Sequence, residues 1–149
     1  MSEVAIGITA PEGVALSVLA HLKKGKIDEA IARFAEKLSF KDHGIGLEFK
    51  QKERLSEYFR KTRELYPHSF LELDAILVSG DHVIIEWTLQ YTVTEPFHNG
   101  LSRKVPVSVH GASIARTEDG KITDWADYYD GRASRRTALA AYFEEWVEL

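Results

Sequence analysis

Two aspartates stand in sequence surroundings where a carboxyl group could carry acid and base chemistry. Asp42 follows the apolar Phe40 at the end of a predicted strand, and Asp127 lies in the aromatic segment Trp125–Tyr129. If the strand phases described below hold, both side chains point toward the enclosed side of a sheet. Apolar surroundings raise the pKa of a carboxyl group toward the range in which it exchanges protons near neutrality. The two acids are therefore candidates for proton transfer, and they could divide that work.

Each aspartate also has a purely structural interpretation. Asp42 could cap or turn the loop before Gly44, as aspartates often do. Asp127 could pair with a nearby arginine or hydroxyl group. Perturbed acids mark functional sites in some proteins and structural networks in others. Both interpretations stay open at the level of sequence.

Other kinds of catalytic chemistry find no support in the residue pattern. The chain has no cysteine, which excludes disulfides, thiolate ligands and cysteine nucleophiles. No two of its six histidines show helical i, i+4 spacing with a nearby acid, so no metal site is predicted. There is no Gly-x-Ser-x-Gly elbow, and Gly44-Ile45-Gly46 lacks the third glycine of a phosphate loop. We expect neither a metal nor a cofactor.

Three histidines, His43, His98 and His110, lie where the mouth or wall of a pocket could be. Alternation with Val109 points His110 to the opposite face of its strand, unless a bulge at Gly111 resets the phase. A surface or interface histidine is the alternative.

The composition indicates one domain without a polyanionic partner. The chain has 149 residues, of which 44% are hydrophobic and 11% aromatic, so we expect a single domain over residues 1–149. Its 19 basic and 23 acidic residues give a net charge of -4, which disfavours nucleic acid and anionic membranes. The segment Met1–Ala5 carries an acid, and no apolar run approaches the roughly 20 residues of a membrane span. A cytoplasmic protein is expected.

Segments of the first half show helical periodicity. Apolar residues recur at three- and four-residue intervals from Pro11 to Lys24, and proline suits a first helical turn. The pattern resumes from Ile27 to Leu38. A third apolar stripe from Leu55 to Leu65 is stopped by Pro67, and Ser39 to His43 is interpreted as a short strand between the second and third helices.

The second half changes to the two-residue period of strands. A strand begins at Phe70, residues Val83 to Val93 alternate, and a β-branched run leads from Val105 to Arg116. A final strand is predicted from Lys121 to Tyr129. Helices followed by antiparallel strands are typical of the α+β class.

Two turns and a last helix complete this pattern. Ser79-Gly80-Asp81 and Glu118-Asp119-Gly120 have the composition of hairpin turns, and Glu95 to Lys104 is interpreted as a loop. Asp130 could cap a C-terminal helix, because the residues that follow keep helical spacing.

Two segments carry a resemblance to the nuclear transport factor 2-like superfamily, which includes ketosteroid isomerases, limonene epoxide hydrolases, scytalone dehydratases and SnoaL-type polyketide cyclases. They are Gly25 to Asp42 and Glu118 to Asp130. The second closely resembles the C-terminal segment of SnoaL-type cyclases and of epoxide hydrolases. The order of the elements is similar over nearly the whole chain. The resemblance implies a cone-shaped barrel of a curved, mostly antiparallel mixed sheet. N-terminal helices and a C-terminal helix would cover it and enclose a pocket for a small, largely apolar molecule.

The ketosteroid isomerase pattern can be laid on the sequence from Leu22 to Phe59 without a gap, and its proton-shuttling carboxylate then falls on Asp42. Its three hydrogen-bonding positions fall on Val18, Phe59 and Ala112, whose side chains cannot bond an oxyanion. Losing one such donor costs about a hundred- to thousandfold in turnover. Steroid isomerisation by that mechanism is therefore not expected.

Two other members of the superfamily point to Asp127. The late-strand aspartate of the epoxide hydrolases matches Asp127, whereas the arginine and second aspartate of that site fall on Trp87 and Leu89. In the SnoaL-type cyclases the corresponding late-strand acid is implied to shuttle the proton for ring closure. The resemblance thus implies Asp127 and Asp42 as catalytic residues.

The same resemblance implies a set of residues that bind the substrate. Aromatic lining of a pocket and ordinary core filling require the same residue types, so both interpretations stay open. The predicted set is Val18, Leu22, Phe59, Trp87, Leu89, Tyr91, His110, Ala112 and Tyr129.

The polar face of the longest alternating strand, with Glu86, Thr88, Gln90 and Thr92, could face solvent or a second copy of the chain. In the resembling family this face usually meets its twin, which implies a homodimer.

We therefore expect a cofactor-independent isomerase, cyclase or hydrolase that transfers protons on a small hydrophobic molecule through carboxyl groups. A non-catalytic module of the same fold, which binds a ligand or serves as a dimeric scaffold, is the alternative.

Overall fold

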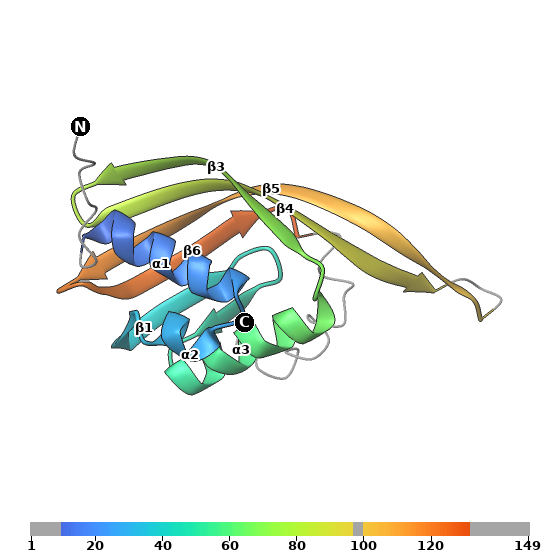
Figure 1. Cartoon of the computed structure of the whole chain (residues 1–149), viewed down its shortest axis with the longest axis horizontal. Coiled ribbons are helices and arrows are strands. Elements are labelled where there is room, and N and C mark those ends of the chain that lie inside the picture. Colours follow the sequence, from blue (N-terminus) through green and yellow to red (C-terminus); the bar gives the residue numbers. More distant parts are fainter. Residues whose placement is uncertain (1–9, 97–99, 132–149) are drawn as a thin grey trace.

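The structure is a computed structural model that describes residues 10–96 and 100–131. These residues form an α+β fold of three helices and six strands, which confirms the predicted fold class (Figure 1). Within the described ranges, no helix combines the length and the apolar character that a bilayer crossing requires. The predicted helix after Asp130 lies outside the described residues.

Helix α1 (Pro11–Lys23) confirms the first predicted helix. Its proline occupies the first turn, where the missing N–H group costs nothing, and Gly25 with a φ of 72° follows its end. Helix α3 (Lys52–Leu65) confirms the third, and it ends shortly before Pro67. Both helices bury one apolar stripe under the sheet.

The prediction of a second helix from Ile27 to Leu38 was wrong beyond Ile31. Helix α2 spans Ile27–Ile31, and strand β1 runs over Phe34–Asp42. Strand β1 carries a large irregularity, because its register with the neighbouring strand shifts between Phe34 and Ser39. This bulge leaves Phe34 and Leu38 buried four residues apart, a spacing that imitates a helical period.

The strands form one sheet in the order β2-β1-β6-β5-β4-β3. Strand β2 (Leu47–Phe49) was not predicted, and its three residues pair with β1. The other strands are β3 (Phe70–Ser79), β4 (His82–Pro96), β5 (Ser102–Glu118) and β6 (Lys121–Tyr129). Among the described strands, β1 and β6 are parallel and the other neighbours are antiparallel. The predicted strand over Lys121–Tyr129 is confirmed at both ends.

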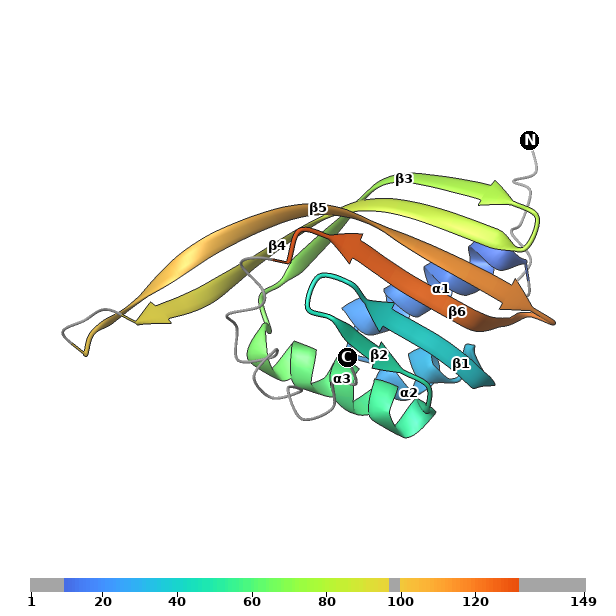
Figure 2. The ribbon, with the colours of Figure 1, turned by 180° about the vertical axis from the view of Figure 1, so that it is seen from behind.

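Both predicted hairpin turns are present. Gly80 has a φ of 59°, and Asp119 and Gly120 have φ values of 52° and 75°. The predicted loop from Glu95 to Lys104 is shorter than expected, because β4 continues to Pro96 and β5 begins at Ser102. Strands β4 and β5 thus extend beyond β3 and β6 as a two-stranded ribbon, which projects from the rest of the molecule in Figure 2.

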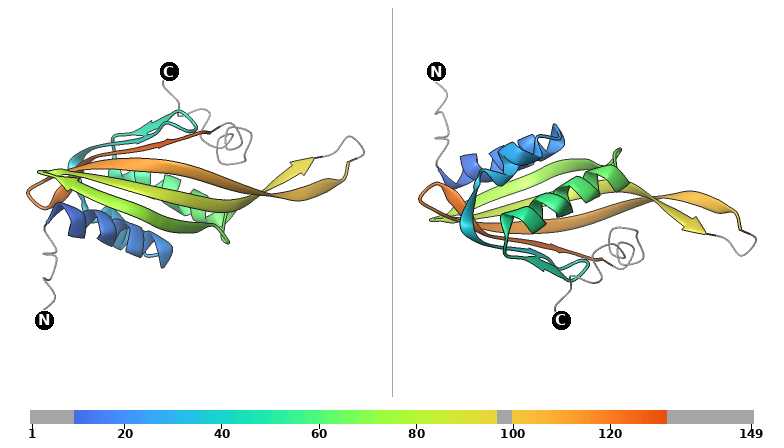
Figure 3. Two further views of the ribbon diagram at one scale, coloured as in Figure 1. Left: turned by 90° about the horizontal axis from the view of Figure 1, so that it is seen from above. Right: turned by 90° about the horizontal axis from the view of Figure 1, so that it is seen from below.

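The sheet is strongly curved but does not close into a barrel, and the helices lie on its concave side (Figure 3). One face of β4 is buried there at alternate positions, with Val83 and Ile85 fully inaccessible and Trp87 6% exposed. These side chains meet α1, while α3 packs on β1 and β2. The concave face and the helices therefore share one apolar core, and this core surrounds the two candidate acids.

Candidate active site

Asp42 and Asp127 lie directly opposite each other on the parallel strands β1 and β6. Their neighbours two residues earlier, Phe40 and Trp125, are also register partners, and both are buried in the core. Because side chains alternate along a strand, the two carboxyl groups point to the same concave side. The strand phases expected from the sequence are therefore those of the structure at both positions.

The carboxyl group of Asp127 is held on one oxygen by two donors. The hydroxyl group of Ser113, its register partner on β5, donates to Oδ1 at 2.5 Å. The indole Nε1 of Trp125 donates to the same oxygen at 2.8 Å. Behind them, Nε1 of Trp87 donates to Oγ of Ser113 at 2.8 Å. Residues from β4, β5 and β6 thus fix the orientation of this carboxyl group.

Asp42 is held more completely. Its Oδ1 accepts the backbone N–H groups of Gly44 at 3.0 Å and Ile45 at 3.2 Å, and its Oδ2 accepts the hydroxyl group of Tyr58 at 2.6 Å. The Tyr129 hydroxyl group is a further hydrogen-bonding neighbour of this carboxyl group. The side chain is 2% exposed. Its contacts fit the structural interpretation, in which Asp42 turns the loop that begins at Gly44.

Burial shifts the pKa of both acids upward. Loss of hydration is the largest cause at Asp127, the charge of Asp42 adds to it, and the pKa rises to about 7 even though Ser113 and Trp125 oppose the shift. The residue keeps part of its surface exposed, yet its carboxyl group lies deep enough for desolvation to dominate. At Asp42 burial also raises the pKa, and the hydrogen bonds from Tyr58, Tyr129 and the loop backbone oppose it.

The donors around the pair decide which acid holds a proton. Burial and the charge of Asp42 raise the pKa values of Tyr58 and Tyr129 far above the usual range, so both stay protonated and donate. Hydrogen bonds to an ionised carboxylate favour its charged form. Asp42 receives more of them than Asp127, so the hydrogen bonds favour ionisation of Asp42 over ionisation of Asp127.

Glycines allow aromatic rings to approach the acids closely. A Cβ atom on Gly44 would come within 2.0 Å of the Tyr129 ring, and one on Gly111 would come within 2.5 Å of the Trp87 ring. The rings of Trp87 and Tyr129 contact each other with centroids 5.8 Å apart. Aromatic rings therefore pack around the hydrogen-bond network of the two acids, with Trp87 at Ser113 and Tyr129 at Asp42.

The structure brings seven of the predicted binding residues to the concave side. Val18 and Phe59 are buried core residues, and the ring of Phe59 meets that of Phe40 edge-on at 5.5 Å. Leu22 is partly buried against the same core. The others are Trp87, Leu89 and Tyr91 on the inner face of β4 and Tyr129 on β6.

His110 and Ala112 lie on the opposite, outer face of the sheet and drop out of the candidate site. The β4 and β5 register continues without interruption past Gly111, so the bulge that could have turned His110 inward is not formed. His110 is exposed, and its Nδ1 lies 2.8 Å from the hydroxyl group of Thr88. The ring of His43 stacks on Tyr128 at 4.4 Å, and His98 lies outside the described residues.

Sequence reasoning missed Ser113 and Tyr58 as members of the site. Ser113 has the inward phase of β5 and is 3% exposed, so a polar residue at an apolar position was the available signal. Tyr58 was read as part of the apolar stripe of α3, and nothing local shows that its hydroxyl group meets Asp42.

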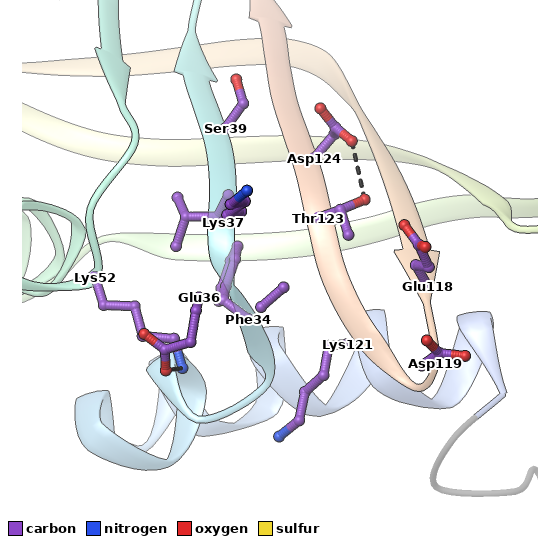
Figure 4. Close-up of a pocket in the computed structure, with 12 residues that line it drawn as sticks. Phe34, Glu36, Lys37, Ser39, Lys52, Glu118, Asp119, Lys121, Thr123 and Asp124 are labelled. Carbon is purple, nitrogen blue, oxygen red and sulfur yellow. Dashed lines mark hydrogen bonds and ion pairs between the residues drawn. The ribbon is translucent and has the colours of Figure 1, made fainter.

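A separate hollow of about 710 Å³ opens where β1 and β6 diverge at the β1 irregularity (Figure 4). Of its charged side chains, Lys52 pairs with Glu36 at 3.2 Å, and Nζ of Lys121 donates to the carbonyl oxygen of Ala32 at 2.7 Å. Neither Asp42 nor Asp127 lines it. Among the described side chains, no group of three or more histidines and acids is placed to hold a metal ion.

A family model described as the SnoaL-like domain matches residues 16–125. The chain belongs to the SnoaL-like domain family. The match includes Asp42 and ends at Trp125, so it does not extend to Asp127. None of the curated proteins matches the chain significantly.

Solved structures place this SnoaL-like domain among proteins of the same fold. A candidate SnoaL-like polyketide cyclase from Jannaschia sp. CCS1 is 16% identical with a TM-score of 0.72, covering 93% of this chain and 99% of that one. A protein of ketosteroid isomerase-like fold from Catenulispora acidiphila, in complex with trimethylamine, is 23% identical with a TM-score of 0.67 (80% and 86% covered). IdmH, a candidate polyketide cyclase from Streptomyces antibioticus, is 15% identical with a TM-score of 0.67 (80% and 91% covered). At these identities the likeness establishes the fold.

Proposed function

We propose that this SnoaL-like domain is a cofactor-independent enzyme that transfers a proton on a small apolar molecule, with Asp127 as the general acid and base. The observation that carries the proposal is the state of its carboxyl group, which two donors orient and whose pKa burial raises to about 7. A catalytic acid or base works best when its pKa lies near the pH at which it operates. Asp127 therefore has the acidity that the reaction needs.

Asp42 has a different part in this proposal. Its oxygens are occupied by the donors of Gly44, Ile45 and Tyr58, so it is poorly placed to take a proton from a substrate. Its charge raises the pKa of Asp127. Asp42 thus acts through Asp127, as a fixed negative charge at its side.

The reaction class is an isomerisation, a cyclisation or a hydrolysis. The aromatic surface of Trp87 and Tyr129 beside Asp127 suits an apolar, cyclic or carbonyl-containing substrate. The likeness to candidate polyketide cyclases supports the same range. Val18 and Phe59 offer no hydrogen-bond donor to an oxyanion. Other groups would therefore have to stabilise the negative charge of an enolate, or the reaction would proceed without an enolate.

Ligand binding without turnover is the second candidate. The lack of polar atoms on Val18 and Phe59 favours it, as does the trimethylamine found in the Catenulispora acidiphila protein of the same fold. Native mass spectrometry of the protein from its own host, followed by extraction, would identify a retained molecule. Recovery of that molecule intact after long incubation would support binding, and release of a product would support catalysis.

The experiment that tests the catalytic proposal is turnover of a panel of enolisable and epoxide substrates by the wild type and variants. Asp127→Asn should lower turnover by about a hundred- to ten-thousandfold, which is the usual contribution of a general acid or base. Asp124→Asn is the matched control, because Asp124 is an exposed acid on the same strand. Full activity of Asp127→Asn would discard the role of Asp127.

The proposal includes a homodimer formed through the outer face of the sheet. Leu77, Ile84, Ile114 and Ala126 are successive register partners, so an apolar row crosses four strands on that face. Leu77 is 61% exposed and Ile114 37% exposed. A second copy of the chain would cover this row with an identical one.

A further inference from the structure

The hydrogen bonds around Ser113 have a fixed direction. An indole N–H group donates and cannot accept, so Nε1 of Trp87 must donate to Oγ of Ser113. The hydroxyl hydrogen of Ser113 is then directed away from Trp87. The remaining partner of Ser113 is Oδ1 of Asp127, which therefore receives that hydrogen.

The second donor completes the occupation of this oxygen. Nε1 of Trp125 donates to the same Oδ1 and likewise cannot accept. A carboxyl oxygen has two lone pairs in the carboxyl plane, and Ser113 and Trp125 use both. A proton on Oδ1 would face two donors at once, so this oxygen stays a hydrogen-bond acceptor in either charge state of Asp127.

The other oxygen is different. Among the described residues, Oδ2 of Asp127 has no hydrogen-bond partner. The titratable groups that surround the carboxyl group are Asp42 on β1, Tyr58 on α3 and Tyr129 on β6, and their mutual contacts are centred on Asp42. Oδ2 is thus the oxygen of Asp127 that can still bind a proton or form a hydrogen bond.

We infer that Oδ2 is the single atom through which Asp127 exchanges its proton, and that Ser113 is the positioning residue that enforces this by keeping its hydroxyl group on Oδ1. The inference rests on the proposed function for its catalytic meaning, because it names the reacting atom of that site. The proton moves between Oδ2 and the substrate, and the Ser113 hydroxyl group keeps its own hydrogen throughout. Serine therefore orients the acid and takes no part in the transfer.

The structure supports the arrangement from two sides. The β5–β6 register places Ser113 directly opposite Asp127, so the short serine side chain is long enough to contact the carboxyl group. Gly111, two residues earlier on the same strand face, leaves room for the Trp87 ring, since a Cβ atom there would lie 2.5 Å from that ring. The glycine thus allows the indole to reach Ser113.

Infrared difference spectroscopy between low and high pH tests the inference without a substrate. The carbonyl band of protonated Asp127 is assigned by its loss in Asp127→Asn. If the carbonyl oxygen is Oδ1, Ser113→Ala and Trp125→Phe each remove one of its two hydrogen bonds, so the band should move to higher frequency in both. The midpoint of its titration should rise by about one pH unit, because a donor to the carboxylate is lost.

The control variants distinguish the loss of a hydrogen bond to Oδ1 from a general effect on folding. Ser108→Ala changes an exposed serine on the same strand and should leave the band and its midpoint unchanged. Ser113→Thr keeps the hydroxyl group and should restore the wild-type midpoint. Trp125→Phe keeps the test valid if Ser113→Ala does not fold, because it removes the other donor from the same oxygen.

The outcomes also distinguish the inference from the proposed function. A band that stays in place or moves to lower frequency in folded Ser113→Ala and Trp125→Phe would mean that the proton sits on Oδ1, and the inference would be overturned even if Asp127→Asn is inactive. Full turnover by Asp127→Asn, together with the expected band shifts, would leave the proton assigned to Oδ2 and refute the catalytic role alone.

Discussion

Asp42 and Asp127 are register partners on two parallel strands, and each carboxyl group has its own set of donors. The strands bring two negative charges to one buried place, where they cannot both ionise at low cost. The donors resolve this conflict because Asp42 receives backbone and tyrosine groups while Asp127 keeps one oxygen without a partner among the described residues. The donors therefore favour Asp42 as the ionised member of the pair and Asp127 as the protonated one.

Asp42→Asn should lower the pKa of Asp127 below about 7, because the charge of Asp42 is one of the causes that raise it. Carbon-detected NMR titration of the Asp127 carboxyl group measures this directly. Asp124→Asn, on the outer side of the same strand as Asp127, should leave the midpoint in place. An unchanged midpoint in folded Asp42→Asn would show that the two acids are not coupled.

The stability of the protein should fall as pH rises toward neutrality, and Asp127 should cause part of that fall. The pKa of Asp127 is raised from 3.8 to about 7, so between these values the folded state keeps a proton that the unfolded chain releases. The free energy of unfolding therefore falls as the pH rises through this window, and it becomes constant above it.

The measurement is urea unfolding of wild type and Asp127→Asn from pH about 4 to about 8. Because the variant lacks this group, its stability relative to wild type should increase by about 1–3 kcal/mol between the ends of the window, after allowance for partial exposure. The raised pKa of Asp42 acts in the same direction in both proteins, so the difference between them reports Asp127 together with its charge coupling to Asp42. A constant difference across the range would contradict the raised pKa.

Tyr58→Phe should destabilise the fold by about 1.5–3 kcal/mol, because it removes a buried hydrogen bond to a charged group. The ring and its aromatic contacts with Phe40 and Phe49 remain. Tyr128→Phe is the control, since that tyrosine is 45% exposed on the outer face. Equal free energies of unfolding for the two variants would mean that the Tyr58 hydroxyl group does not hold Asp42.

The parts of the fold that the sequence predicted are those with an uninterrupted local period. On β4 the two-residue interval holds at the buried residues Val83, Ile85, Trp87 and Tyr91. On β6 it holds only from Trp125 onward, because Ile122 and Trp125 are buried three residues apart. The inward direction of Asp127 follows from the same alternation, because Trp125 two residues earlier is a core residue. A local pattern is sufficient to predict a strand and the direction of its side chains wherever only one face of the sheet packs against the core.

The parts that could not be predicted depend on contacts between distant segments. The irregularity between Phe34 and Ser39 gives β1 a helical spacing, and its pairing with β6 decides its conformation. The opposition of Asp42 and Asp127 needs the register of two parallel strands far apart in the chain. The hydrogen bond from Trp87 to Ser113 likewise joins residues of different strands, and no local sequence pattern around either residue predicts it.

Ile114→Lys should convert the proposed dimer into a folded monomer. Ile114 lies in the apolar row of the outer face, where a charge buried against an identical row would have no partner. Light scattering coupled to size-exclusion chromatography gives the mass, and circular dichroism shows whether the variant is folded. Val78→Lys is the control, because Val78 is 47% exposed but has the opposite phase to Leu77 on β3. A wild type that is monomeric at all concentrations, or a dimer that Ile114→Lys leaves intact, would show that this face is not the interface.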